Sequence, residues 1–254
     1  MPKRTEYNRF ISYVNQFAFK KVNKCFNTLL EGLSPPLCVL CGGKGQMGRE
    51  LCLECEQDLP VIDVACVRCG IPLPVEGVCG QCLRHPPAFS FTMAAYHYLP
   101  PVDSLVKKLK YKGELHLARL LGELVAERLE AADIDMPDII VPVPLHFQRL
   151  RERGYNQALE LARPIADRLK LPIDIIHVTR IRETDPQSTL SVSQRPRNVK
   201  GAFAVADEFK SKSVAIVDDV MTTGHTVNEL AISLRRNGAT NISVWVCARA
   251  VFGS

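Results

Sequence analysis

The sequence predicts an α/β fold: a parallel sheet covered by helices on both faces, preceded by a small double zinc ribbon. Two observations support this prediction. Four C-x-x-C pairs lie between residues 38 and 82, and beyond Pro87 buried strands alternate with amphipathic helices. We therefore expect an amphipathic helix in residues 1–33, the double zinc ribbon in 34–89 and the α/β domain in 90–254.

Composition sets the class of the protein. The 254 residues are 46% hydrophobic and 23% charged, which suffices for one full core and a small module. The sequence has no window of eighteen uncharged apolar residues and no signal-peptide layout, so we expect a cytoplasmic protein that does not span a membrane. Ten cysteines without an export signal are more typical of metal ligands than of disulfides.

Residues 1–33 carry apolar side chains at steps of three to five residues, which is typical of an amphipathic helix. Lys20, Lys21 and Lys24 cluster near its middle. We favour packing of this helix on protein. The alternative, a membrane-surface helix, would place the protein at the inner face of the membrane.

The four C-x-x-C pairs indicate two zinc sites. Each pair directs two thiolates to one point, and two pairs complete the tetrahedral four-sulfur shell that zinc prefers. We favour sequential pairing, although spacing alone leaves interleaved pairing open. The predicted ligands are Cys38, Cys41, Cys52 and Cys55 for the first site and Cys66, Cys69, Cys79 and Cys82 for the second. We expect His85 on the surface and Cys247 in the core.

Zinc also changes the charge balance. From Ser34 to Phe89 six acids oppose four basic residues, and two four-thiolate zinc sites take this segment from −2 to −6. The formal net charge of the chain falls from +5 to +1. Between Pro144 and Lys200 eleven Lys and Arg residues oppose six acids. These charges favour nucleic-acid binding. Equally, they could serve only the phosphates of a small ligand or lie on solvated faces.

Past Pro87 the periodicity defines the expected elements. The predicted strands are 91–98, 138–145, 173–178, 214–217 and 241–250, and the predicted helices are 101–113, 114–132, 155–170 and 225–238. A basic loop is expected between Leu145 and Tyr155. In such a sheet, function lies at the carboxyl ends of the strands.

The stretch "SVAIVDDVMTTGHT" predicts a binding site at one of these ends. After the buried strand come two carboxylates, Asp218 and Asp219, and then hydroxyls around Gly224. Threonine hydroxyls, a glycine and the free N–H groups at a helix start form a cradle for one phosphate dianion. Two carboxylates would repel that phosphate, so we expect them to face the vicinal hydroxyls of a sugar, with a divalent cation close by. The pattern predicts a ribose 5-phosphate site.

From about Leu33 to Arg249 the chain resembles the ComF-type competence proteins, whose α/β domain is of the type I phosphoribosyltransferase kind. The resemblance rests on the four C-x-x-C pairs and on the stretches "LKYKG", "VPVPLHFQRLRERGYNQ", "RIRETDPQSTLSVSQRPRNVKGAF" and "VAIVDDVMTTGHT". It implies a phosphoribosyltransferase-like sheet that binds phosphoribosyl pyrophosphate with Mg²⁺.

The resemblance also implies roles for individual residues. Asp218 and Asp219 would hold the ribose hydroxyls and would be the catalytic pair if transfer occurs. The further residues implied to bind phosphoribosyl pyrophosphate are Val143, Pro144, Arg149, Arg153, Met221, Thr222, Thr223, Gly224, His225 and Thr226. Residues 180–201 correspond to a mobile loop, whose pattern is matched by Thr184, Gln187, Arg195 and Asn198.

Two functions stay open. The first is a competence factor that binds phosphoribosyl pyrophosphate and handles single-stranded DNA during natural transformation, with DNA-uptake or recombination proteins as partners. The second is an active phosphoribosyltransferase with an unidentified nitrogenous acceptor. The sequence shows no segment that would recognise a nucleobase, so binding of phosphoribosyl pyrophosphate is better supported than its transfer.

Overall fold

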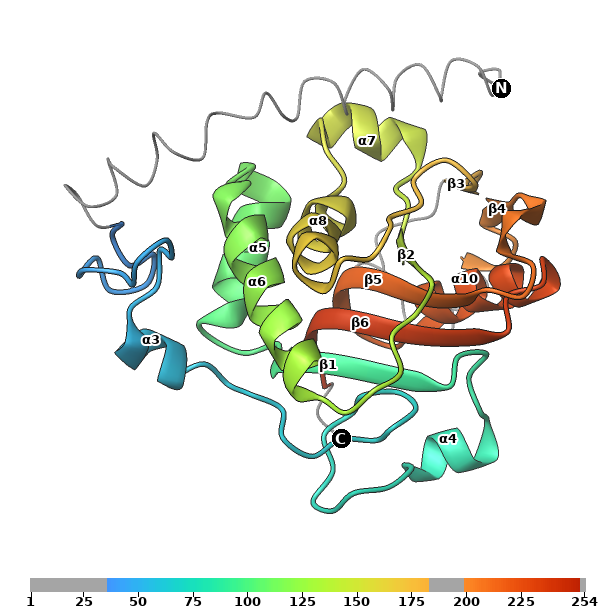
Figure 1. Ribbon diagram of the computed structural model, residues 1–254, viewed down its shortest axis with the longest axis horizontal. Coiled ribbons are helices and arrows are strands. Elements are labelled where there is room, and N and C mark those ends of the chain that lie inside the picture. Colours follow the sequence, from blue (N-terminus) through green and yellow to red (C-terminus); the bar gives the residue numbers. More distant parts are fainter. Residues whose placement is uncertain (1–35, 183–198, 252–254) are drawn as a thin grey trace. The chain divides into compact units, whose positions relative to one another are not determined.

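The computed structural model describes residues 36–182 and 199–251 (Figure 1). They form two compact units, which divide between Leu59 and Pro60. The first cysteine cluster lies in the first unit, whereas the second lies in the same unit as the sheet. The helix predicted in residues 1–33 falls outside the described residues.

The first unit is organised around its cysteines and the buried Leu51 and Leu59. Leu51 is fully buried, and helix α3 (Leu53–Gln57) follows it directly. The carboxylate of Glu56 accepts hydrogen bonds from Gln46 Nε2 at 2.6 Å and from Arg49 Nη1 at 3.1 Å. These polar contacts stabilise a segment that is too short to have a large apolar core.

The second unit is built on a four-stranded parallel sheet in the order β1-β6-β5-β2. The strands are β1 (Phe91–His97), β2 (Ile139–Pro142), β5 (Ser213–Met221) and β6 (Asn241–Arg249). Strand β6 lies inside the sheet and is buried from Val244 to Arg249, because a parallel sheet is covered on both faces. The predicted parallel sheet is therefore confirmed.

Helices cover both faces of this sheet (Figure 1). The predicted helices are α5 (Val102–Lys112), α6 (His116–Ala131), α8 (Gln157–Leu169) and α10 (His225–Arg236). Helices α6 and α8 pack closely, and Gly122 permits this because a Cβ there would lie 2.4 Å from Pro164. Helix α10 contributes Val227, Leu230 and Leu234 to the core that contains Val214 and Ile216.

Two sequence predictions were wrong. The basic loop expected after Leu145 contains helix α7 (Phe147–Arg153), which buries Leu150 and ends at the left-handed Gly154. The strand expected at 173–178 does not form as one piece. The Asp174 carboxylate accepts hydrogen bonds from the next turn, so strand β3 (Val178–Arg180) begins only at its end.

Smaller elements complete the described part of the chain. Strand β3 pairs antiparallel with β4 (Phe203–Val205), and helix α4 (Gly80–Arg84) and the 3₁₀ turn η1 (Asp207–Phe209) are short. Each described helix falls short of the length and apolarity needed to cross a bilayer.

Candidate functional site

Asp218 and Asp219 lie near the carboxyl end of β5, as expected, although the strand continues to Met221. Adjacent residues of a strand point to opposite faces of the sheet, so the two carboxylates have different surroundings. Asp219 is 3% exposed, whereas Asp218 is only partly buried. The two carboxylates are therefore suited to different roles.

A lysine that the sequence analysis did not select pairs with Asp219. Lys110 Nζ, from the "LKYKG" stretch in α5, lies 2.6 Å from Asp219 Oδ2. Burial alone would raise the pKa of Asp219, but Lys110 outweighs burial and lowers it. Burial would likewise lower the pKa of Lys110, and Asp219 raises it instead. Asp219 is thus held ionised by an internal cation.

Asp218 behaves in the opposite way. Its pKa is raised well above the usual value for aspartate by burial and by the neighbouring charge of Asp219. Its Oδ1 accepts a hydrogen bond from the Asp219 N–H at 2.9 Å. The pair therefore combines one ionised carboxylate with one that retains its proton more readily.

The predicted phosphate cradle, residues 222–226, comes directly after β5. The chain leaves β5 at Met221, passes through Gly224 with φ of +78°, and enters α10 at His225. Thr223 Oγ1 is buried and has no hydrogen-bond partner among the described residues. A buried hydroxyl without a partner at a helix N-terminus fits an anionic oxygen.

Two stretches far apart in sequence pack together beside Asp219. The Tyr155 hydroxyl donates to the Leu109 carbonyl, and the Arg153 guanidinium lies 5.7 Å from the centre of the Tyr111 ring. Arg153 Nη1 also donates to Gln157 Oε1 at 2.5 Å. This packing of residues 153–157 on α5 helps to position Lys110.

The predicted pyrophosphate loop lies beside the same stretch. Val143 and Pro144 are buried directly after β2, and Asn156 Nδ2 donates to the Val143 carbonyl at 3.0 Å. The Val143 N–H donates to the Val217 carbonyl at 2.9 Å. This loop therefore lies against β5, next to the two aspartates.

The charge of Arg180 interacts with those of Arg149 and Asp218. Arg180 is the last residue of β3. Its guanidinium lies 5.6 Å from the centre of the Phe203 ring, and its backbone forms an isolated parallel β-bridge with His146 in the loop after β2. Its pKa is lowered by burial and by Arg149, and Asp218 acts in the opposite direction. Two neighbouring guanidinium groups are suited to a pyrophosphate. In the sequence Arg180 is recognisable only as the first residue of the expected loop. Its partners lie in other elements, so local sequence does not reveal them.

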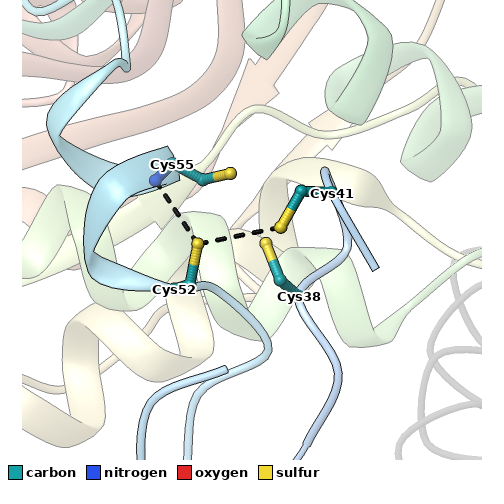
Figure 2. Close-up of side chains that lie close together, drawn as sticks. All are labelled: Cys38, Cys41, Cys52 and Cys55. Atoms are coloured by element: carbon teal, nitrogen blue, oxygen red, sulfur yellow. Dashed lines mark hydrogen bonds between the residues drawn. The ribbon is translucent and has the colours of Figure 1, made fainter. Parts of the chain in front are cut away.

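The cysteines form the two sequentially paired clusters that the sequence analysis favoured. Within each cluster all four sulfurs lie within 4.8 Å of one another. Figure 2 shows the first cluster, in which Cys52 Sγ accepts a hydrogen bond from the Cys55 N–H and lies 3.8 Å from Cys41 Sγ. In the second, Cys69 Sγ lies 3.7 Å from Cys79 Sγ. Four converging thiol groups fit zinc, so the two clusters indicate two structural zinc sites.

One cysteine in each cluster, Cys38 and Cys66, has a lowered pKa, whereas the pKa values of Cys52, Cys55, Cys69 and Cys82 are raised. Burial would raise the pKa of Cys66, but backbone N–H groups of Cys79 and Cys69 outweigh burial and lower it to about 7. Thiolate is the form that binds a metal. His85 is exposed and Cys247 is buried, as expected.

The four loop residues Thr184, Gln187, Arg195 and Asn198 lie outside the described residues. Their predicted role stays a prediction. The other residues implied to bind phosphoribosyl pyrophosphate lie in the loop after β2, in α7, at the end of β5, in the turn that follows it or at the start of α10.

Two family profiles match the chain. Residues 29–83 match the double zinc ribbon domain, and residues 155–250 match the phosphoribosyl transferase domain. "DNA utilization protein YhgH" of Escherichia coli K12 is 35% identical over 223 residues, which is 85% of this chain and 98% of that protein. "Competence protein F" of Haemophilus influenzae is 35% identical over 222 residues, covering 84% and 96%.

The chain belongs to the ComF family. Its α/β unit is phosphoribosyltransferase-like, and its C-x-x-C pairs belong to a double zinc ribbon. Among solved structures, the purine phosphoribosyltransferase of Pyrococcus horikoshii is 21% identical with a TM-score of 0.31, over 53% of this ComF chain and 86% of that one. The names of these two relatives support a competence-type role.

Proposed function

We propose that this protein binds phosphoribosyl pyrophosphate with Mg²⁺ at the carboxyl end of β5 and handles single-stranded DNA beside that site. The observation that carries the proposal is the combination of Asp218 and Asp219 with a phosphate cradle whose Thr223 hydroxyl is buried and has no partner among the described residues. A sugar phosphate would use both halves of this arrangement, the carboxylates for hydroxyls and the cradle for phosphate.

The donor set fits Mg²⁺ that arrives with the ligand. Magnesium is usually bound through one or two carboxylates together with substrate phosphates. Asp219 is already paired with Lys110, which leaves Asp218 as the carboxylate best placed for a metal. When bound, Mg²⁺ would neutralise part of the negative charge of the pyrophosphate. We expect its arrival to lower the raised pKa of Asp218.

The chain's own residues would then divide the work. Asp219, fixed by Lys110, would accept a hydrogen bond from a ribose hydroxyl and orient the ring. The hydroxyls and N–H groups from Thr222 to Thr226 would hold the 5-phosphate. Arg149 and Arg180, with Arg153 beside them, would contact the pyrophosphate.

A working phosphoribosyltransferase is the second candidate. It is favoured by the electrostatic interaction between Arg149 and Arg180, because two guanidinium groups can stabilise the charge of a departing pyrophosphate. Release of pyrophosphate in the presence of a nitrogenous acceptor would support this function. Tight binding without release would support a binding protein.

Single-stranded DNA is expected along the basic segment. Arg149, Arg151 and Arg153 lie on α7, and Arg195 and Arg197 fall outside the described residues. Binding should be nearly independent of sequence and should weaken steeply with salt. The measurement is a salt titration of labelled single strands on the native protein and on Arg149→Ala, Arg151→Ala and Arg195→Ala. If all four share one slope of log affinity against log salt, the DNA lies elsewhere.

The ligand itself is tested by calorimetry. Phosphoribosyl pyrophosphate should bind with Mg²⁺, and ribose 5-phosphate should bind more weakly because it lacks the pyrophosphate. Asp218→Asn and Asp219→Asn should each cost about 1.5–3 kcal/mol of binding free energy. Unchanged affinity in both variants would overturn the assignment. Asp207→Asn is a matched control, because Asp207 lies in the turn η1 and not at the end of β5.

A further inference from the structure

Arg249, the last residue of β6, connects the second cysteine cluster to the phosphate cradle. It is 6% exposed. Its Nε donates to the Cys69 carbonyl at 2.9 Å, and its Nη1 donates to the Met221 carbonyl at 3.0 Å and to the Thr222 carbonyl. Cys69 is a predicted zinc ligand, and Met221 and Thr222 begin the cradle. One buried side chain thus contacts both sites.

The second cluster is fixed to the sheet at several consecutive points. The Val67 carbonyl accepts a hydrogen bond from the Thr92 N–H at 2.9 Å, and the Arg68 carbonyl accepts one from Thr92 Oγ1 at 2.6 Å. The Cys69 carbonyl is the next in the chain and is bound by Arg249. Gly70, with φ of +65°, lies so close to Thr92 that a Cβ would meet its methyl group at 2.8 Å. The C-x-x-C turn is therefore held by β1 and β6.

The contacts of Arg249 also orient the cradle. In a planar trans peptide the carbonyl of one residue points away from the N–H of the next. The Met221 carbonyl also accepts a hydrogen bond from the Ala250 N–H at 3.0 Å, so this backbone contact and Arg249 together turn the N–H groups of Thr222 and Thr223 to the opposite side. These are N–H groups of the cradle to which the proposed function assigns the 5-phosphate.

We propose that Arg249 is a positioning residue for the phosphate cradle, and that it couples the affinity of the cradle for a phosphorylated ligand to metal occupancy of the second cysteine cluster. The first part stands on the contacts of Arg249, and the ligand part rests on the proposed function. Metal at Cys66, Cys69, Cys79 and Cys82 holds the turn that supplies the Cys69 carbonyl. Loss of the metal releases that turn, and with it one of the groups that keep the guanidinium in place.

The test begins without any ligand. Backbone hydrogen exchange is compared at Ala250 and Asn228, whose N–H groups donate to the Met221 and Gly224 carbonyls at 3.0 and 2.9 Å, between native protein, Arg249→Ala and Cys79→Ser. Cys79→Ser removes one ligand of the second cluster and leaves the turn from Cys66 to Gly70 unchanged in sequence. Both variants should exchange roughly tenfold faster than native at these amides. Cys52→Ser, which removes the equivalent ligand of the first cluster, is the matched control and should leave the exchange unchanged.

Affinity measurements then test the coupling. Arg249→Ala and Cys79→Ser should each weaken binding of phosphoribosyl pyrophosphate with Mg²⁺ roughly tenfold or more, and the double variant should be little worse than either single one. Coupling is reciprocal, so the ligand should raise the zinc affinity of the second cluster, measured by chelator competition, in native protein and not in Arg249→Ala. Arg249→Lys keeps a charge but not the second donor, so it should fold as native and lose the coupling.

Each outcome bears on one proposal. Unchanged exchange in a folded Arg249→Ala variant, or equal effects of Cys79→Ser and Cys52→Ser, would overturn the positioning role. If circular dichroism shows that Arg249→Ala does not fold, the positioning role is tested instead with Arg249→Lys and with the comparison of Cys79→Ser and Cys52→Ser. If the variants show the expected exchange pattern but native protein does not bind phosphoribosyl pyrophosphate, the positioning role of Arg249 stands and the proposed ligand is refuted.

Discussion

The ammonium group of Lys110 lies 2.6 Å from the carboxylate of Asp219, although the two residues belong to different elements, α5 and β5. The Asp219 side chain is 4% exposed and that of Lys110 is 24% exposed, so water screens the pair only weakly. An enclosed ion pair at this position keeps one carboxylate charged in a site that is otherwise costly for two adjacent acids.

Replacing Lys110 should destabilise the protein and disturb the site. Lys110→Met leaves Asp219 enclosed without its cation, which should cost about 3 kcal/mol of unfolding free energy. The measurement is urea denaturation at pH 7. Lys107→Met is the matched control on the same helix, because the Lys107 side chain, which pairs with Asp103, is 54% exposed and its loss should cost much less. Equal losses in the two variants would contradict a special role for Lys110.

Asp218 should make the native protein less stable as pH rises. Its folded pKa is raised above the usual 3.8, so the folded state keeps a proton that the unfolded state releases. Its contribution to the unfolding free energy is therefore largest below that value and declines as pH rises towards the folded pKa. Asp218→Asn should remove this decline, as seen by urea denaturation at several pH values from 4 upward. Identical pH slopes for native and variant would refute the raised pKa.

The contribution of Asp219 to stability has the opposite pH dependence. Lys110 lowers its folded pKa, so the ion pair contributes stability above the usual aspartate value, and this contribution is lost as pH falls through the lowered pKa. Asp219→Asn should therefore be less stable than native at pH 7, whereas Asp218→Asn should be as stable or more stable. The check is the order of the thermal midpoints of the three proteins. Any other order would show that the two carboxylates are not differentiated as described.

The cradle should not tolerate a side chain at Gly224. Gly224 has φ of +78°, and a Cβ there would lie 2.7 Å from Met221 Cε. Gly224→Ala should weaken binding of phosphoribosyl pyrophosphate and cost roughly the 1 kcal/mol of a left-handed alanine, plus the small cost of shifting the end of the flexible but buried Met221 side chain. Gly48→Ala, with φ of +73° and no atom within 4 Å, carries only the backbone cost. The difference in thermal midpoint between the two variants measures the contact, and no difference would count against a tightly packed cradle.

Two zinc ions should be present per chain. Elemental analysis should give two for native protein and one for either Cys52→Ser or Cys79→Ser, because each variant breaks one four-sulfur cluster. A value of one or none for metal-replete native protein would refute the two-site scheme. Chelation should release both ions, and its effect on the sheet should come through the second cluster, whose carbonyls are bound by β1 and β6.

Features that depend on short-range spacing could be predicted from the sequence alone. The cysteine pairs could be assigned as ligands because a C-x-x-C turn brings two sulfurs together locally. Asp218 and Asp219 could be placed at a strand end because an apolar run stops directly before them. Family resemblance added the roles of these residues. The parallel sheet followed from alternating strands and helices.

Only the tertiary structure decided which distant residues meet. Lys110 reads as an ordinary residue of an amphipathic helix until α5 packs beside β5, and Arg180 reads as part of a loop until β3 ends near Asp218. Arg249 lies 180 residues from Cys69 along the chain. Such contacts arise from packing between elements, and no local periodicity encodes them. Helix α7 was missed for a related reason, because burial of Leu150 depends on the folded unit and not on a sequence repeat.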